Sequence, residues 1–118
     1  MPFCYNVATM GAKLLGEFEQ AILLAVLRRG EGAYGLAIRQ ELESRTGRRV
    51  SHGSAYITLD RMQAKGLVKS RLADPADGRG GRRKRYFQVT AVGIRALRES
   101  RSALIRLWDG VDEVLEES

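Results

Sequence analysis

The 118-residue chain is 44% apolar and 29% charged, proportions that are typical of a folded protein with one domain. Its net charge of +6 favours an anionic partner, and the charge is uneven: residues 1–90 hold 16 Lys or Arg against 8 Asp or Glu, whereas residues 91–118 hold 4 against 6. One Cys and one His exclude an internal disulfide and leave too few ligands for a Cys/His metal site, so we expect neither metal nor cofactor.

Residues 1–13 are predicted to form an N-terminal tail, and Met10 is a second candidate start beside Met1. The tail lacks the basic start and long apolar stretch of a signal peptide. The longest apolar run, residues 21–27, is too short to cross a bilayer. We therefore expect a cytoplasmic protein without a membrane partner.

Residues 14–29 are predicted to form a first helix that ends at Gly30. Its apolar residues lie on two sides, with Leu15, Phe18, Ile22 and Val26 on one and Leu23 and Leu27 well away from it. Such a helix needs cover on both sides, from later helices of the same chain or from a second subunit. We favour the second subunit, which makes Leu15, Leu23 and Leu27 candidates for a dimer interface.

A second helix is predicted over residues 33–46, with Leu36, Ile38 and Leu42 inward and Gly47 as its stop. After the extended link "RRVS", Ser51 is a suitable N-cap for a third helix that reaches Lys65. The third helix has a narrow apolar stripe (Ala55, Leu59 and Met62) and a polar, cationic opposite flank. Two short helices of this kind indicate a helix-turn-helix.

The next segments predict a β-hairpin. "LVKSRLA" (67–73) and "KRYFQVT" (84–90) alternate as strands do, and "DPADGRGG" between them has the composition of a loop. Five cations crowd its tip and returning strand: Arg79, Arg82, Arg83, Lys84 and Arg85. Because alternate strand residues face opposite sides, we expect some of residues 83–85 to pair with acidic groups of the same chain. A solvated run of charge is the plain alternative.

Thr90 is predicted to cap a last helix from Ala91 to about Glu117. Its apolar residues follow the a/d spacing of a coiled-coil seam, which Arg101 interrupts once: Leu97, Leu104, Trp108, Val111 and Leu115. Two copies of this seam, packed together and against first helices, would give a two-fold homodimer.

Three segments resemble the PadR-type transcriptional regulators: "AYGLAIRQEL" (33–42), "VSHGSAYITLDRMQAKGLV" (50–68) and "GGRRKRYFQVTAVG" (80–93). The resemblance covers about residues 14–115, with Ala55 where a larger aliphatic residue is more frequent and Gln63 where Glu is common. It implies a mainly α fold with a small β-hairpin, in which residues 14–90 form a winged helix-turn-helix. Residues 91–118 would form the C-terminal dimerisation helix, as in the compact subgroup of the family.

We therefore expect a dimeric repressor that binds double-stranded DNA at a pseudo-palindromic operator, with cations on the phosphates and the third helix in the major groove. The candidate DNA-binding residues are Tyr34, Ser51, His52, Ser54, Tyr56, Ile57, Arg61, Lys65, Arg79, Arg82, Arg83 and Lys84. Arg61 suits a guanine edge or a phosphate, and Ile57 a thymine methyl group. For Arg61 a solvated surface cation is the alternative. For the tyrosines it is ring packing in the core.

The resemblance also suggests a small aromatic effector that binds near Trp108 at the dimer interface, with plain dimer packing as the alternative for this residue. An enzyme is excluded by the lack of any nucleophile, base and acid set or nucleotide fingerprint. The alternative function is a winged-helix module for protein–protein assembly. Steep salt dependence would favour specific DNA binding over that module.

Overall fold

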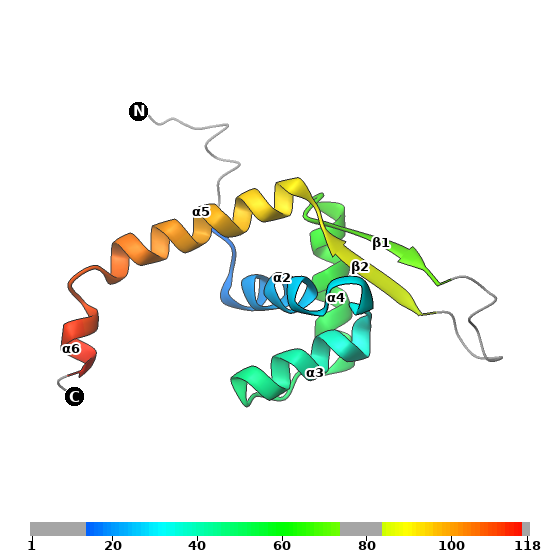
Figure 1. Cartoon of the computed structure of the whole chain (residues 1–118), viewed down its shortest axis with the longest axis horizontal. Helices are drawn as coiled ribbons and strands as arrows, with labels where there is room; N and C mark the ends of the chain where they lie inside the picture. The colour runs from blue at the N-terminus through cyan, green and yellow to red at the C-terminus, as the bar shows by residue number, and fades with distance from the viewer. Residues whose placement is uncertain (1–13, 74–83, 117–118) are drawn as a thin grey trace.

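The computed structural model describes residues 14–73 and 84–116 of the chain, so Arg79, Arg82 and Arg83 lie outside the described residues. The elements follow in the order α2 (Glu17–Arg29), η1 (Gly30–Gly32), α3 (Gly35–Thr46), α4 (His52–Ala64), β1 (Val68–Leu72), β2 (Arg85–Val89), α5 (Ala91–Trp108) and α6 (Asp112–Glu116). The predicted order of three helices followed by a hairpin is confirmed, but two helices follow the hairpin where the sequence predicts one (Figure 1).

Helix α2 lies at the centre of the molecule, and α3, α4, α5 and β2 all pack against it (Figure 1). Ile22 and Leu23 are both 0% exposed. The prediction that Leu23 faces a second subunit is therefore wrong, because elements of the same chain cover that side of α2. The large apolar side chains of α2 that stay open are Leu24, at 50% exposure, Leu27, at 46%, and Phe18, at 36%.

Helix α3 is held to α2 by the carboxylate of Glu41, which accepts hydrogen bonds from Arg45 Nε at 2.6 Å and Arg29 Nε at 2.9 Å. The hydrogen bond from Arg45 and then the contact with Arg29 hold the pKa of Glu41 below its usual range, against the opposing effect of burial. Ile38 and Leu42 of α3 are buried as predicted. Leu36 is not, since 48% of it is exposed.

Helix α4 begins where the sequence predicts. The Ser51 hydroxyl accepts the Ser54 N–H at 3.0 Å and so satisfies one of the free donors of the first turn. Ala55, Leu59 and Met62 are all 0% exposed, which confirms the inward stripe. The burial of these three side chains fixes the rotation of α4 about its axis.

The hairpin is antiparallel, with Val68 opposite Val89 and Leu72 opposite Arg85. Its inner face buries Val68, Phe87 and Val89 against the helices. Tyr34 forms a β-bridge with Tyr86 on the free edge of β2, and Phe87 N–H donates to the Ala33 carbonyl at 2.8 Å. A third extended segment, just before α3, therefore joins the hairpin to the helix-turn-helix.

The C-terminal region differs from the prediction of one helix to about Glu117. Thr90 does cap α5, accepting the Gly93 N–H at 3.1 Å, but α5 ends at Trp108. Gly110 has a φ of 85°, and the short α6 follows. Val111 and Leu115 are therefore not on one continuous helix with Leu104.

Only the first half of α5 packs against the body of the protein. Leu97 is half-buried against the core, and the buried Ser100 hydroxyl accepts the Leu15 N–H at 3.0 Å. Beyond Ser100 the helix extends away from the other elements, as Figure 1 shows. None of the helices in the described part of the chain is long and apolar enough to cross a membrane.

Gly93, at the junction of the hairpin and α5, generates a prediction. A Cβ there would overlap the Leu67 carbonyl oxygen and would lie 2.7 Å from Val89 Cγ1. Gly93→Ala should therefore lower the free energy of unfolding by about 1–3 kcal/mol, as overpacking does. Urea denaturation gives the value, provided that the m-value is unchanged.

The matched control is Gly53→Ala, because Gly53 also lies in a helix but has no atom within 4 Å of an added Cβ. Alanine should raise stability there by roughly 0.5–1 kcal/mol through helix propensity. A Gly93→Ala protein as stable as the Gly53→Ala protein would contradict the close approach at Gly93.

Candidate nucleic-acid interface

The outer face of α4 presents three predicted DNA-binding residues together. Ser54, Ile57 and Arg61 are spaced at i, i+3 and i+7, so they share one side of the helix, and all three are exposed. Ile57 is 59% exposed and gives this side of the helix an apolar surface. Within the described part of the chain, Arg61 forms no ion pair. This side of α4 is free to meet a ligand.

At the start of α4, Ser51 is committed to its own helix. Its hydroxyl accepts the Ser54 N–H and donates to Ser54 Oγ at 2.9 Å. Ser51 thus acts as a helix cap. An anion near it would be bound by the free N–H groups of the first turn, which lie beside Ser51. His52 is exposed next to it, with its ring centroid 4.5 Å from that of Tyr56.

The two predicted tyrosines use their rings to join elements. Tyr56 is half-buried, its ring 6.2 Å from that of Phe87, and its hydroxyl lies so close to Gly35 that a Cβ there would overlap it. Tyr34 makes an edge contact with Tyr86, with 5.7 Å between the ring centroids. The packing role that the sequence left open is therefore present for both tyrosines.

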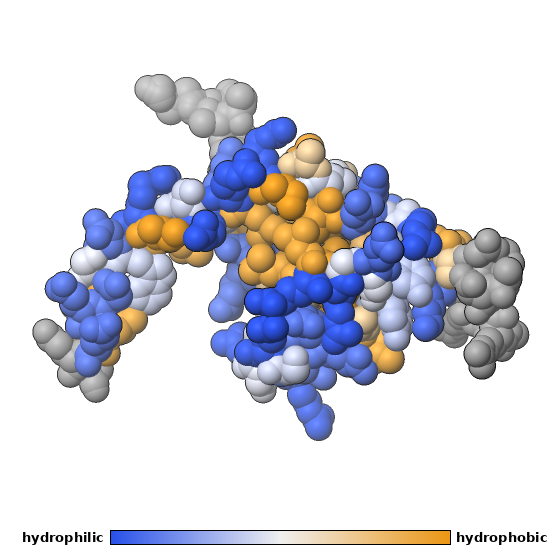
Figure 2. Space-filling view, in the orientation of Figure 1, coloured by the Kyte–Doolittle hydropathy of each residue, from blue (hydrophilic) through white to orange (hydrophobic). Residues whose placement is uncertain are grey.

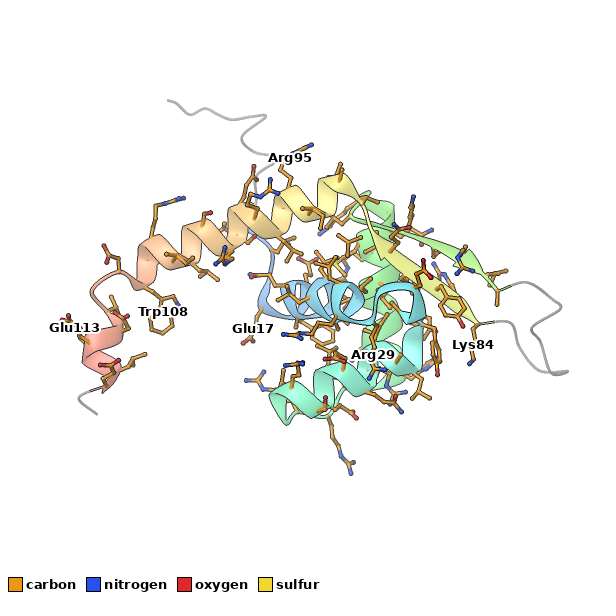
Figure 3. All side chains as sticks on the ribbon, viewed as in Figure 1. Glu17, Arg29, Lys84, Arg95, Trp108 and Glu113 are labelled. Carbon is orange, nitrogen blue, oxygen red and sulfur yellow. The ribbon has the colours of Figure 1, made fainter. Side chains whose placement is uncertain are left out.

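The structure treats the two lysine candidates differently. Lys84 directly precedes β2, with its Nζ 4.4 Å from the centroid of the Tyr34 ring (Figure 3). Lys65 directly follows the C-terminal end of α4 and forms an ion pair with Glu19 of α2 at 3.3 Å. Lys84 therefore presents an unneutralised charge beside the helix-turn-helix, whereas the charge of Lys65 is already matched.

Arg85 donates to three acceptors, of which Asp60 and Gln63 lie on α4 and connect the hairpin to that helix, while Ser70 lies on β1. Its Nη1 donates to Asp60 Oδ1 at 2.9 Å, its Nη2 to Gln63 Oε1 at 3.0 Å and its Nε to Ser70 Oγ at 3.1 Å. Ser70 in turn donates to Gln63 Oε1 at 2.7 Å. We call Arg85, Asp60, Gln63 and Ser70 the wing clamp. We expected some of residues 83–85 to pair with acidic groups of the same chain, and Arg85 confirms this by its ion pair with Asp60.

The wing clamp gives a physical use to Gln63, the position where the resembled family more often has Glu. The amide oxygen of Gln63 accepts from both Arg85 and Ser70, while Asp60 supplies the charge. Asp60 and Gln63 are three residues apart and so lie on the flank of α4 that faces the hairpin. Helix α4 therefore has three distinct sides, for the core, for the hairpin and for a ligand.

Sequence reasoning missed three cations in this region. Arg49 lines a shallow hollow together with Ser51, Ser54 and Ile57, and its signal was the pair of arginines just before the N-cap. Lys69 and Arg71 lie on the outer face of β1, where strand alternation places them. None of the three forms an ion pair within the described residues.

An exposed, rotationally fixed helix beside unneutralised cations suits the duplex, because the major groove admits one helix and the phosphates attract the cations. No group of three or more His, Cys, Asp or Glu in residues 14–73 and 84–116 is arranged to hold a metal ion.

Comparisons with known proteins agree with this arrangement. The chain is 43% identical over 76 residues to the transcriptional regulator Rv3488 of Mycobacterium tuberculosis, a match that spans 63% of this chain and 64% of that protein's length. It is also similar in structure to a PadR family transcriptional regulator from Eggerthella lenta, with 27% identity, a TM-score of 0.64 and coverage of 86% of this chain and 88% of the other.

A PadR-like transcriptional regulator from Bacillus cereus is similar as well, with 26% identity, a TM-score of 0.67 and coverage of 83% and 90%. Residues 23–99 match the transcriptional regulator PadR-like family, and this range includes α3, α4, the hairpin and most of α2. The fold class expected from the sequence, a winged helix-turn-helix, is thereby confirmed. The chain belongs to the PadR-like family of DNA-binding transcriptional regulators, which are not enzymes.

Proposed function

We propose that this protein is a dimeric repressor that binds a pseudo-palindromic DNA operator through α4. One observation carries the proposal: Ser54, Ile57 and Arg61 form an open face on a helix whose rotation Ala55 and other core residues fix. A two-fold dimer places two such helices about one turn of DNA apart. Residues 14–90 would then be the DNA-binding domain, and residues 91–118 the dimerisation region.

Four exposed residues of α4 are assigned a DNA contact in this proposal. Arg61 meets a phosphate or a guanine edge, and Ile57 meets a thymine methyl group. His52 and Ser54 contact the duplex near the start of the helix. In the wing, Lys84 supplies a phosphate contact, and Arg79, Arg82 and Arg83 are proposed to do the same from outside the described residues.

The proposed dimer rests on apolar surface that the chain leaves uncovered. In α5 beyond Ser100, Leu104 is 38% exposed and Trp108 47%. Figure 2 shows further apolar surface over the middle of the molecule, between α5 and α2. Contiguous exposed apolar surface of this kind marks an association site.

The proposed interface differs in part from the sequence-based one. Leu24 replaces Leu23, because Leu24 is exposed and Leu23 is buried. Leu15 and Leu97 pack partly against the core of their own chain, so they border the interface. The residues proposed to lie in it are Leu24, Leu27, Leu104, Trp108, Val111 and Leu115.

We also propose that a planar aromatic effector binds beside Trp108 and relieves repression. Trp108 is the chain's one tryptophan, and its half-exposed ring offers a stacking surface in the region proposed for the dimer interface. Figure 3 places it at the far end of α5, on the opposite side of that helix from Arg95.

The first test is binding to the DNA upstream of the protein's own gene. We expect it to bind more tightly than a scrambled duplex at physiological salt, in an electrophoretic mobility shift assay. The affinity should fall steeply as salt rises, since each neutralised phosphate contributes a slope of about −0.9 in log K against log salt. Equal affinity for the scrambled duplex would favour the protein–protein alternative.

Arg61→Ala sharpens this test and has Arg95→Ala as its control. Loss of one phosphate contact in each subunit, two in the dimer, should weaken binding to all duplexes and reduce the slope by about 1.8. Loss of a base contact should instead cost about 1–3 kcal/mol at one base pair only. Arg95 lies on the outer side of α5 (Figure 3), so its replacement should change neither quantity.

Arg85→Ala should give a different pattern, because this arginine positions the wing and is not proposed to touch DNA. Its guanidinium is held by Asp60, Gln63 and Ser70. We expect a loss of affinity with no change in the salt slope, measured by fluorescence anisotropy across a salt series. Asp60→Asn should show the same pattern more weakly, because its side chain is 58% exposed and its ion pair is partly screened.

A reduced salt slope in the Arg85→Ala protein would show that Arg85 contacts a phosphate, and the positioning role would then be wrong. Arg85→Lys keeps the charge but not the planar set of donors, so it should not restore affinity.

The emission of Trp108 tests the dimer and the effector with one probe. Dilution should shift the emission to longer wavelength as the dimer dissociates and the ring becomes wetter. Titration with planar aromatic compounds should quench it in a saturable way. An emission maximum independent of protein concentration from nanomolar to micromolar would contradict burial of Trp108 at the interface, and a panel without saturable quenching would contradict the effector.

A further inference from the structure

The end of the chain has a chemistry that the proposed function does not use. Residues 109–118 contain five Asp or Glu and no Lys or Arg. Helix α6, within this segment, exposes Asp112, Glu113 and Glu116 together with Leu115, which is 55% exposed. A five-residue helix is marginal on its own in water, so packing against another surface would stabilise it.

A groove of complementary chemistry lies at the other end of the molecule. It runs between the C-terminal end of α2 and the outer face of the hairpin, and we call it the α2–wing groove. Lys69 and Arg71 supply two cations on one side, and Leu27 supplies an apolar wall on the other. Arg71 lies over the ring of Tyr86, 4.9 Å from its centroid, and Glu31 is the one acidic residue among the described lining residues.

We propose that α6 of a second copy of this chain occupies the α2–wing groove. Its carboxylates would face Lys69 and Arg71, and Leu115 would pack on Leu27. The inference rests on the dimer of the proposed function and specifies which surfaces meet in it. Leu27 connects the two ideas, because it belongs both to the exposed apolar side of α2 and to the groove.

The same chain does not supply the occupant. Helix α6 and the hairpin lie at opposite ends of the molecule, whose longest dimension is 54 Å (Figure 1). A DNA phosphate backbone fits the groove less well than α6 does. The carboxylate of Glu31 repels a phosphate backbone and an acidic helix alike, so Leu27 decides between them: its apolar side chain gains nothing from a phosphate but can pack on Leu115.

The proposed contact would connect the dimer to the DNA-binding surface. Lys69 and Arg71 are on β1, β1 pairs with β2, and Arg85 of β2 donates to Asp60 of α4. A partner helix seated on the outer face of the hairpin would therefore hold the wing, and through the wing clamp it would bear on α4.

Disulfide trapping between two different variants tests the contact. In a Cys4→Ser background, a Lys69→Cys protein is mixed with a Glu113→Cys protein and oxidised. We expect a heterodisulfide dimer to be the main product, detected by mass spectrometry. The control replaces Lys69→Cys with Arg45→Cys, whose site on α3 is exposed and outside the groove, and it should give much less product.

Charge reversal gives a second measurement on the uncrosslinked protein. Lys69→Glu with Arg71→Glu should raise the dimer dissociation constant about tenfold in sedimentation experiments, as should Asp112→Lys with Glu113→Lys. Mixing the two variants should form a heterodimer in which both contacts join opposite charges, one as in the wild type and one with the charges exchanged. This heterodimer should be more stable than either homodimer, each of which has two contacts between like charges.

The outcomes separate this inference from the proposed function. A wild-type chain that stays monomeric at all concentrations would overturn the proposed dimer and this contact with it. A stable dimer without heterodisulfide above the control would overturn only the contact. If Lys69→Ala with Arg71→Ala lowers the DNA salt slope and leaves the dimer unchanged, the groove cations serve DNA, and the contact is also overturned.

Discussion

The constraint on which the rest of the fold depends is the burial of α2 on more than one side. Ile22, Leu23 and Val26 are 0–2% exposed, and no single neighbouring helix can cover residues that point in such different directions. The chain meets this need with α3 and α4 on one side and with β2 and the start of α5 on the other. The hairpin is therefore a part of the core as well as a wing.

Using half of α5 for this purpose has a consequence for the other half. The helix is anchored up to Ser100, whose hydroxyl accepts the Leu15 N–H, and then extends away from the other described elements (Figure 1). An amphipathic helix that leaves its own core exposes an apolar stripe to water. The proposed function therefore needs a second subunit, because only a partner would cover this exposed apolar stripe.

The local structure could be predicted from the sequence wherever a local interaction decides it. The caps at Ser51 and Thr90 and the inward stripe of α4 depend on residues within one or two turns. The prediction for Leu23 was wrong for the opposite reason. Periodicity shows that two sides of a helix must be buried, but it does not show whether the same chain or a second subunit buries them. The break after Trp108 was missed because Val111 and Leu115 continue the heptad spacing, while Gly110 takes a positive φ that ends the helix.

The candidate site shows the same division. The open face of α4 follows from spacing alone, but the partners of its charged neighbours do not. Lys65 pairs with Glu19, 46 residues away, and Arg85 reaches Asp60 across 25 residues. Only the packing of α2, α4 and the hairpin brings these groups together, so the sequence could not separate neutralised cations from free ones.

That separation is what turns a basic composition into a directional surface. Arg29, Arg45 and Lys65 each form an ion pair with a carboxylate, so their charge is neutralised within the fold. The described cations around α4 and the hairpin that lack one are Arg49, Arg61, Lys69, Arg71 and Lys84. A duplex and an acidic helix are both attracted by such charge, and the neighbours decide between them. Arg61 lies beside Ile57 on a fixed helix of the width that a major groove admits, whereas Arg71 lies across a groove from the apolar side chain of Leu27. The first setting suits DNA and the second suits a protein segment, so one excess of positive charge would serve two different partners on two sides of the hairpin.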